Sequence, residues 1–550
     1  MAKMHKHAIG MVFLFFLAIG WASPAQAQTE AQGEGYWIPN DKAEEAAELL
    51  KQGKSVEELG IESFQKANKE DNFQTLNELR NDQQSAATYE TYLDPPKLTE
   101  QGWTPPEFNY DHITSTEECR NHPSSSSETG YIKNRYSFCW SHVATFIWAG
   151  HAVQFQFTEI GYGSNQSRKM RIYYQIDDII VTHPSLNGVK LKVDFDCTPK
   201  LNPTDCKVDS STPAVERPIA QWKNQNFGTK IFYSEAPEAT ETNPDQLGFM
   251  EFWPKLTITH KPAKFTKTID GISQTVRFDS AKYMFAFPNT YFPHGAVFSE
   301  AIPVLKVPVT KPEFEVLREA GEHWKFAMEN PEQTRPYVLG KKIPGAVGDR
   351  PLTRMYTKRH EEEYQKNRNY TRTICNREFQ NEDRTGKECD EFPFASTWEG
   401  SAMNGLDWFS VRLISKESNG AAGAWLGAWY AYDRILDGDR FYVNVEAPEK
   451  VASIRSDGNP LPGQDNRSSE NFTIDNIPPY ATRLEWRIVD GPANATFDVM
   501  KDNRFWVDET IFYDLGHGSI TEIQTGDHFY IARPKNTDGN PFTVEVYAIP

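Results

Sequence analysis

The feature that most constrains the fold is a long region in which apolar and polar residues alternate. From about Tyr131 onward, apolar side chains occupy every second position in several short segments: 153–157, 170–173, 189–195, 256–259 and 283–287. Successive side chains of a β-strand point to opposite faces, so each segment predicts a strand with one buried face. Short strands separated by clusters of Gly, Pro and Asn are typical of a sandwich or barrel. We therefore expect a β-sandwich-like domain at residues 131–310.

The rest of the chain predicts further domains, because 550 residues exceed what one hydrophobic core usually organises. Residues 41–84 have a thin apolar stripe typical of a helical leader, and residues 85–130 have the Pro- and Ser-rich composition of a linker. We therefore assign residues 28–130 to leader and linker. Helices are predicted at 312–330, 352–378 and 421–436, and strands at 484–489, 495–499, 529–531 and 542–549.

The N-terminus has the pattern of a secretory signal peptide. Lys3 and Lys6 precede an apolar run, Ala8 to Ala22, and a small-x-small site ends at Ala27. The run is shorter than the ~20 residues that a membrane span needs, and no later segment is more apolar. We therefore expect cleavage of residues 1–27, secretion, and no stable insertion into the membrane.

Six cysteines form three couples that are close in sequence: Cys119 and Cys139, Cys197 and Cys206, Cys375 and Cys389. An even number of cysteines in an exported chain favours disulfides. Zinc binding is the competing interpretation, but the chain has no C-x-x-C motif and no nearby pair of histidines. We predict disulfides and no catalytic thiol.

The charge of the chain is unevenly distributed. The whole sequence carries a formal charge of −18, which argues against a generally basic coat for nucleic acid. Between Arg335 and Arg377, however, eleven basic residues face only four acidic ones. A local basic surface suits a polyanionic substrate, whereas a solvated helix with internal ion pairs is the simpler explanation for any single residue.

Directly after the basic segment, three carboxylates lie within ten residues among aromatic neighbours: Asp390, Glu391 and Glu399. Carboxylates in apolar surroundings need a cation, a shared proton or hydrogen bonds. Their oxygens are the usual ligands of Mg²⁺, Mn²⁺ and Ca²⁺, and such an ion can orient a phosphodiester and acidify a water. The alternative is a surface turn followed by a helix end, with no ligand role.

Two further polar residues flank this cluster. Asn419 precedes a helix rich in small residues, where Asn is ordinarily an N-cap, although its amide could also contact a metal or a phosphate. His360 is the only histidine between Arg359 and Gly516, and a lone helical histidine is more often a surface or packing residue than a base.

The segment from Cys389 to Gly400 resembles the NucA/NucB deoxyribonucleases. The likeness continues through Phe409–Arg412, Asn419–Gly427 and Ile435–Val443, and upstream through Ile343–Gly345, Pro351–Arg354 and Asn367-Arg368. It covers about a fifth of the chain. The resemblance implies a small α/β domain that cuts DNA endonucleolytically, with little sequence preference and generally with a divalent cation.

The resemblance also implies roles for individual residues. Asp390 and Glu391 match the acidic pair of the family, Glu399 matches its downstream Glu-Gly, and Asn419 matches the Asn before the small residues. Gly420 departs from the family, which commonly has Arg after that Asn, so rate or substrate preference is in doubt. Phosphate binding is expected from three arginines: Arg368, Arg372 and Arg412.

Together these expectations describe a multidomain, β-rich plus α+β protein. The sandwich-like domain is followed by a connecting helix at 311–334, the nuclease domain at 335–447 and a C-terminal β module at 448–550. We predict a secreted deoxyribonuclease with Asp390, Glu391, Glu399 and Asn419 as catalytic residues and the three carboxylates as ligands of Mg²⁺, Mn²⁺ or Ca²⁺. DNA is the expected substrate. An inhibitor protein, the oligomeric state and the role of the β modules are left open.

Two other functions are kept as alternatives. The first is a secreted surface or binding protein that retains an inactive nuclease-like domain, which Gly420 favours. The second is a glycoside hydrolase, which would need two of the acids about 5–10 Å apart across a sugar cleft. Aromatic residues in the β region favour this alternative, whereas the basic segment argues against it.

Overall fold

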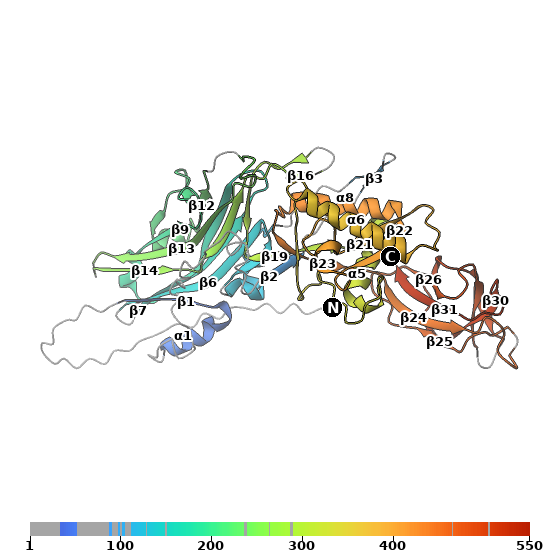
Figure 1. Cartoon of the computed structure of the whole chain (residues 1–550). Coiled ribbons are helices and arrows are strands. Elements are labelled where there is room, and N and C mark those ends of the chain that lie inside the picture. The colour runs from blue at the N-terminus through green and yellow to red at the C-terminus, as the bar shows by residue number, and fades with distance from the viewer. Residues whose placement is uncertain are drawn as a thin grey trace.

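The computed structural model of the chain describes residues 33–51, 87–90, 97–99, 102–104, 112–127, 129–148, 151–235, 239–262, 264–286, 290–464, 466–503 and 507–549. The predicted signal peptide and most of the predicted leader helix lie outside these residues. Within them the chain is β-rich and forms several sheets, with a group of helices between two β regions (Figure 1). No helix of the described ranges has the length and hydropathy that crossing a bilayer requires.

The first β region is a sandwich of two antiparallel sheets. The larger sheet has the strand order β1 (Glu34–Ile38), β6 (Ser137–Trp148), β7 (His151–Tyr162), β8 (Lys169–Val181), β12 (Phe227–Tyr233) and β10 (Lys207–Val208), with β5 (Tyr131–Asn134) beside β6. The smaller sheet has the order β11 (Val215–Pro218), β9 (Lys190–Pro199), β13 (Gly248–His260), β15 (Gln274–Asp279) and β18 (Gly295–Phe298), with β14 (Phe265–Asp270) beside β13. The strands predicted by alternation at 153–157, 170–173, 189–195 and 256–259 are confirmed.

Segments that precede the alternating region also join the sandwich. The edge strand β1 pairs with β6, and α1 (Ala43–Lys51) confirms the start of the predicted helical stretch. Further on, α3 (Thr116–Asn121) lies in the expected linker and is joined to β6 by the disulfide Cys119–Cys139. The other two predicted couples, Cys197–Cys206 and Cys375–Cys389, are also disulfides.

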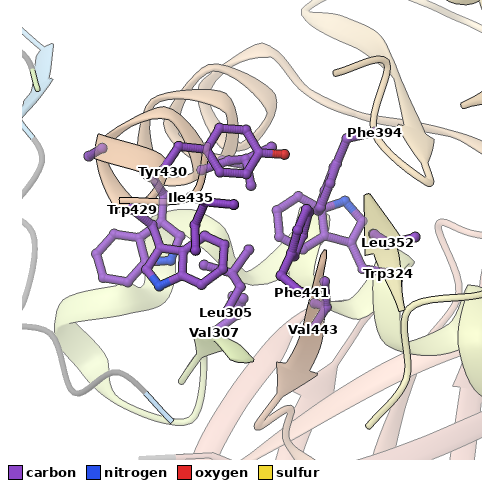
Figure 2. Close-up of a cluster of buried hydrophobic side chains, with 14 of the residues drawn as sticks. Leu305, Val307, Trp324, Leu352, Phe394, Trp429, Tyr430, Ile435, Phe441 and Val443 are labelled. Atoms are coloured by element: carbon purple, nitrogen blue, oxygen red, sulfur yellow. The ribbon is translucent and has the colours of Figure 1, made fainter. Parts of the chain in front are cut away.

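The central region combines a mixed four-stranded sheet with three long helices and the short helix α7 (Ser401–Asn404). In that sheet β2 (Ala87–Glu90), β19 (Ala301–Val307) and β23 (Arg440–Val445) run parallel, and β20 (Leu352–Thr353) closes it antiparallel to β23. The long helices are α5 (Arg318–Glu329), α6 (Glu361–Glu378) and α8 (Lys416–Tyr432). Figure 2 shows side chains of β19, α5, α8 and β23 meeting in one buried apolar cluster, among them Leu305, Trp324, Trp429 and Phe441.

The helix bounds differ in part from those predicted. The segment 312–330 forms a 3-10 turn, Pro312–Leu317, followed by α5, as expected. The predicted helix at 352–378 begins only at Glu361, because residues 352–353 pair with β23 as a strand. The helix predicted from Ala421 begins five residues earlier, at Lys416, because the Ser415 hydroxyl accepts a hydrogen bond from the Ser418 amide and caps it.

The second β region is a smaller sandwich formed by residues 449–549. One sheet has the order β24 (Glu449–Ser456), β31 (Phe542–Ile549), β26 (Arg483–Asp490) and β29 (Ser519–Glu522). The other has the order β25 (Phe472–Ile474), β30 (Gly526–Lys535), β27 (Thr496–Lys501) and β28 (Glu509–Leu515). Trp486, Phe497 and Val544 are central to an apolar core of its own. The C-terminal strands predicted from the sequence are confirmed.

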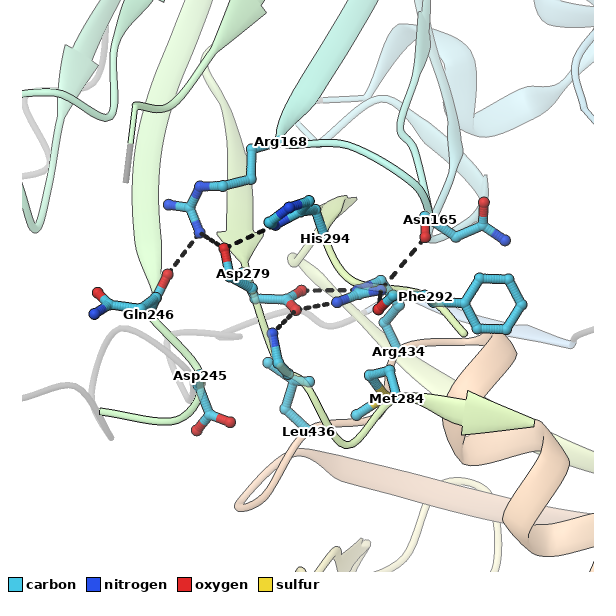
Figure 3. Close-up of polar contacts among 12 residues, drawn as sticks. Asn165, Arg168, Asp245, Gln246, Asp279, Met284, Phe292, His294, Arg434 and Leu436 are labelled. Carbon is cyan, nitrogen blue, oxygen red and sulfur yellow. Dashed lines mark hydrogen bonds and ion pairs between the residues drawn. The ribbon is translucent and has the colours of Figure 1, made fainter. Parts of the chain in front are cut away.

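The first sandwich contacts the central region through buried charges. Arg434, fully buried after the end of α8, forms a two-pronged ion pair with Asp279 of β15, with Nε 2.9 Å from Oδ2 (Figure 3). Arg135 and Arg277 reach Asp439 at 3.0 and 2.5 Å. These charges are buried but paired, which is the condition under which a protein interior tolerates them.

Candidate active site

The predicted acidic segment folds into a hairpin between helices. Its strands, β21 (Lys387–Phe392) and β22 (Ser410–Ser415), pair antiparallel, with Asp390 opposite Arg412. Helix α6 contacts the hairpin, as do α5 and α8. The disulfide Cys375–Cys389 joins α6 to β21 directly before Asp390. Because neighbouring residues of a strand point to opposite faces, the acidic pair is divided between two environments.

Asp390 is buried and is held by α5. Its Oδ2 lies 2.6 Å from Nδ1 of His323 and accepts a hydrogen bond from the indole N–H of Trp324 at 3.0 Å. The other ring nitrogen of His323 lies 2.8 Å from the Ser410 hydroxyl. Ser410 and His323 are each 1% exposed, so a polymeric substrate cannot reach this serine as a nucleophile. The Ser–His–Asp chain therefore fixes the hairpin against α5.

Glu391 points away from α5. It is half-buried, and its backbone and charge partners lie on the side of α6 and the following loop. Burial, and to a smaller extent the neighbouring Asp390 carboxylate, raise the pKa of Glu391 to about 7, although the Arg368 guanidinium on α6 and a backbone hydrogen bond from Ala395 oppose the rise. A carboxyl with this pKa can take up and release a proton at neutral pH, which is what general acid–base catalysis requires.

The exposed side of α6 supplies the positive charge next to Glu391. Arg368 is exposed, lies over the ring of Tyr364 one helical turn earlier and donates to its phenol oxygen at 3.1 Å. Between them Asn367 is fully buried, donates to the Ala395 carbonyl at 3.1 Å and accepts from the Ala402 amide at 2.9 Å. Asn367 thereby holds the loop that follows Glu391 against α6.

Glu399 also lies within this loop, but its hydrogen bonds go to Thr353 of β20 and not to α6. Its two carboxylate oxygens accept hydrogen bonds from the Thr353 amide at 2.7 Å and the Thr353 hydroxyl at 3.0 Å. Burial raises the pKa of Glu399, and the two bonds from Thr353 oppose that rise. This carboxylate joins the loop to β20.

Asn419 lies inside α8, so its expected role as an N-cap is wrong; Ser415 is the cap. The Asn419 amide nitrogen donates to Glu388 at 2.9 Å, at the far end of β21 from the Glu391 loop. The next residue, Gly420, is exposed, and a Cβ added there would meet no atom within 4 Å. The position has room for the arginine expected from the resemblance, but the chain places no side chain there.

The basic residues before the hairpin divide into two groups. Lys341 and Arg354 are buried: Lys341 donates to Thr334 and to the Pro336 carbonyl, and Arg354 donates to the Ile435 carbonyl. All three predicted phosphate-binding residues are exposed: Arg368 and Arg372 on α6 before the hairpin, and Arg412 on β22 within it. The excess of positive charge in the sequence therefore overstates what a substrate can contact.

His360 precedes the first residue of α6 and is three-quarters buried. Its Nε2 lies 3.0 Å from Asp437, and its ring packs edge-on against Trp398 at 4.8 Å between centroids. Asp437 also binds Arg359, which reaches Asp245 of the first sandwich at 3.4 Å. The histidine thus links the Glu391 loop to the interface with the sandwich.

A divalent cation needs several oxygen ligands that converge on one point. Within the part of the chain that the structure describes, no three His, Cys, Asp or Glu side chains gather as a metal-binding group. Asp390 and Glu391 face opposite ways, and the Asp390 and Glu399 oxygens already accept hydrogen bonds from neighbouring residues. The three carboxylates that we predicted as one shell do not fit a shared ion in this arrangement.

Sequence reasoning missed His323, Trp324 and Ser410. His323 lies 67 residues before Asp390, and its helix was predicted only as a connector. No local sequence pattern links His323 to Asp390. In contrast, the separation of Asp390 from Glu391 had a signal: Cys389, Asp390, Glu391 and Phe392 alternate between faces once the segment is recognised as a strand.

The hairpin, the helices that contact it and the Glu391 carboxyl beside the exposed Arg368 all lie in the central region of the chain. Residues 345–444 match the family model described as Deoxyribonuclease NucA/NucB. The match spans the hairpin, α6, α8 and β23, and leaves both β regions and α5 outside it. None of the curated proteins compared with the chain matches it. The C-terminal half therefore contains a nuclease-type domain.

Proposed function

We propose that this protein is an exported endonuclease that hydrolyses DNA phosphodiester bonds with little sequence preference. The observation that carries the proposal is the position of Glu391: a half-buried carboxyl with a pKa near neutrality, next to Arg368, inside the segment that matches the deoxyribonuclease family. Export is supported by the signal-like N-terminus and by three disulfides, which persist in oxidising compartments.

In this proposal Glu391 acts as the general base. Its deprotonated carboxylate takes a proton from the water that attacks phosphorus, and the P–O bond to the leaving oxygen breaks. The Arg368 guanidinium acts electrostatically on Glu391 and lowers its pKa, and in this proposal it would bind a non-bridging phosphate oxygen. Arg372 and Arg412 would bind flanking phosphates, which contribute affinity without base specificity.

In this proposal Asp390, Glu399 and Asn419 are positioning residues: each holds another part of the domain in place. Asp390 anchors β21 to α5, Glu399 anchors the loop to Thr353, and Asn419 pairs with Glu388. A requirement for Mg²⁺, Mn²⁺ or Ca²⁺ stays a prediction from the resemblance. A glycosidase mechanism that pairs Asp390 with Glu391 is disfavoured, because the two side chains point to opposite faces of β21 and cannot flank one bond.

The test is cleavage of supercoiled plasmid by the purified full chain, with and without EDTA. We expect Glu391→Gln to lower the rate at least 100-fold, since removal of a general base typically costs about 10²–10⁴-fold. Glu362→Gln, which changes an exposed carboxylate on α6, is the matched control and should keep the rate. Loss of cleavage in EDTA, restored by Mg²⁺, would support the cation.

The pH profile gives a second readout. The base must be deprotonated, so kcat/KM should rise with pH up to about 7 and then level off. Arg368→Gln removes the charge that holds this pKa down, so the rising limb should move to higher pH, whereas Arg377→Gln in the last turn of α6 should leave it in place. Equal cleavage by wild type and Glu391→Gln would contradict the assignment. No cleavage by the wild type under any condition would favour the inactive, binding form of the protein that Gly420 suggests.

A further inference from the structure

The outer face of the larger sheet of the first sandwich is only partly covered. Near β6 and β7 it carries α3 and the residues before it, and Cys119 of α3 and the preceding Ile113 cluster with Ile160 of β7. Toward β8 and β12 the face is open and contains a groove of about 740 Å³. The groove is lined by residues of three adjacent strands and two loops, chiefly Tyr162, Lys169, Arg171, Tyr173, Asp209 and Ile231.

The strand register explains why these side chains share one surface. Along β8 the residues Met170, Ile172 and Tyr174 are buried in the sandwich core, so the intervening residues face outward. Arg171 pairs across the sheet with Tyr162 of β7 and with Ile231 of β12. Lys169, Arg171 and Tyr173 therefore stand in a row on β8, roughly 6.8 Å apart from one to the next.

The row combines positive charge with accessible rings. The Arg171 guanidinium lies over the Tyr173 ring and donates to its phenol oxygen at 2.9 Å, while Tyr173 remains 40% exposed. Lys169 stands 3.9 Å from Asp209, whose carboxylate also accepts two hydrogen bonds from Ser211. Two cations against one carboxylate leave the groove positive in a chain whose net charge is −18. At the end of the same face Phe227 is 66% exposed.

Cations and aromatic rings in one groove are the two components of single-strand recognition: the cations follow the phosphates and the rings stack on bases. A duplex keeps its base faces stacked inside and would leave the tyrosines unused. An uncharged glycan would leave the cations unused. We infer that this groove binds a single-stranded segment of DNA, as a second site separate from the Glu391 hairpin. The choice of DNA as the polyanion rests on the proposed function.

Binding can be measured without cleavage. The full chain carrying Glu391→Gln is titrated, in EDTA, into a fluorescently labelled oligothymidylate while anisotropy is recorded. Arg171→Glu and Tyr173→Ala change exposed residues of the groove, and Lys261→Glu makes the same charge change on the exposed turn after β13, in the other sheet. Thermal unfolding of each variant verifies that the sandwich is intact.

We expect Arg171→Glu and Tyr173→Ala each to weaken binding about ten-fold or more, as stacking and phosphate contacts of this kind do. Arg171→Glu should also reduce the dependence of log K on log salt by about 0.7, the value for one phosphate of a single strand. Lys261→Glu should bind like the parent. Unchanged binding in both groove variants, equal weakening in Lys261→Glu, or equally tight and equally sensitive binding of a duplex would overturn the inference. Plasmid cleavage by the chain with Glu391 intact is a separate measurement, so the failure of one proposal does not imply the failure of the other.

Discussion

The two β regions are attached to the nuclease-type domain in different ways. At the N-terminal side, Arg434 and Asp279 are both fully buried, and Leu247, Phe249 and Phe292 of the sandwich belong to the same apolar cluster as the helices of the domain. At the C-terminal side, Arg487 binds Glu322 and Arg318 binds the buried Glu485, and the module keeps a separate core. The side chains of Arg487, Glu322 and Arg318 keep 14–22% of their surface exposed.

This difference indicates that the two β regions differ in how independently of the nuclease-type domain they fold and unfold. A shared core with buried ion pairs exposes unpaired charge and apolar surface when the two parts separate, so the first sandwich and the domain should unfold together. A module with its own core and a polar contact resembles a domain joined by a transient interface. Both attachments lie close to functional elements: Glu322 precedes His323 in α5, and Asp245 contacts Arg359 beside His360.

The largest expected effect is that of Asp279→Ala. It leaves Arg434 buried without its main partner, which should lower the free energy of unfolding by about 3–5 kcal/mol. Urea unfolding followed by tryptophan fluorescence measures the loss. Asp196→Ala, at a half-exposed carboxylate of the same sandwich, should change stability by less than about 1 kcal/mol. If Asp279→Ala lowered the free energy of unfolding by no more than Asp196→Ala, the first sandwich and the nuclease-type domain would not depend on this ion pair to unfold together.

Gly295→Ala tests the same interface by packing rather than charge. A Cβ at residue 295 would lie 2.0 Å from Nε of Arg434, whose side chain is enclosed on all sides and cannot move aside. Overpacking of this kind typically costs about 1–3 kcal/mol, and the midpoint of thermal unfolding should fall accordingly. Gly188→Ala, where a Cβ meets no atom within 4 Å, is the matched control. An unchanged midpoint for Gly295→Ala would mean that Arg434 is free to leave Asp279.

The smallest effect is expected at the C-terminal attachment. Arg487→Ala removes two bonds to Glu322, at 2.8 and 3.0 Å, and one to Glu485 at 2.7 Å, while Glu485 keeps its ion pair with Arg318. Because solvent replaces these bonds, we expect about 1 kcal/mol or less, with plasmid cleavage within two-fold of the wild type. Chemical denaturation and the cleavage assay together decide this. A stability loss equal to that of Asp279→Ala, or a large fall in cleavage, would mean that the C-terminal module is coupled to the site through α5.

Local patterns in the sequence predicted a large part of the fold. Alternation identified strands of both sandwiches, the spacing of the cysteines identified three disulfides, and helical periodicity identified α5. Helix starts were less accurate, since Ser415 rather than Asn419 caps α8 and β20 occupies the expected start of the α6 region. In both cases the local sequence allowed two starting points for the helix. A single interaction decided between them: the Ser415 cap for α8, and the pairing of β20 with β23 for the region before α6.

At the candidate site, too, local sequence predicted some features and failed to predict others. The acidic segment and its resemblance to deoxyribonucleases are present in the sequence, and so is the excess of basic residues before it. Burial could not be read from composition: Lys341 and Arg354 are internal, while Arg368 and Arg412 are exposed.

What the sequence determined by itself is what depends on residues close to one another: strands, helices, disulfide couples and the family motif. Only the tertiary structure decided that Asp390 is anchored by His323 and Trp324, that Glu391 turns toward Arg368, and that Arg434 meets Asp279. The physical reason is that a pKa, an ion pair or a buried hydrogen bond depends on which groups share a low-dielectric environment. Chain segments separated by tens to hundreds of residues come to share one only through folding.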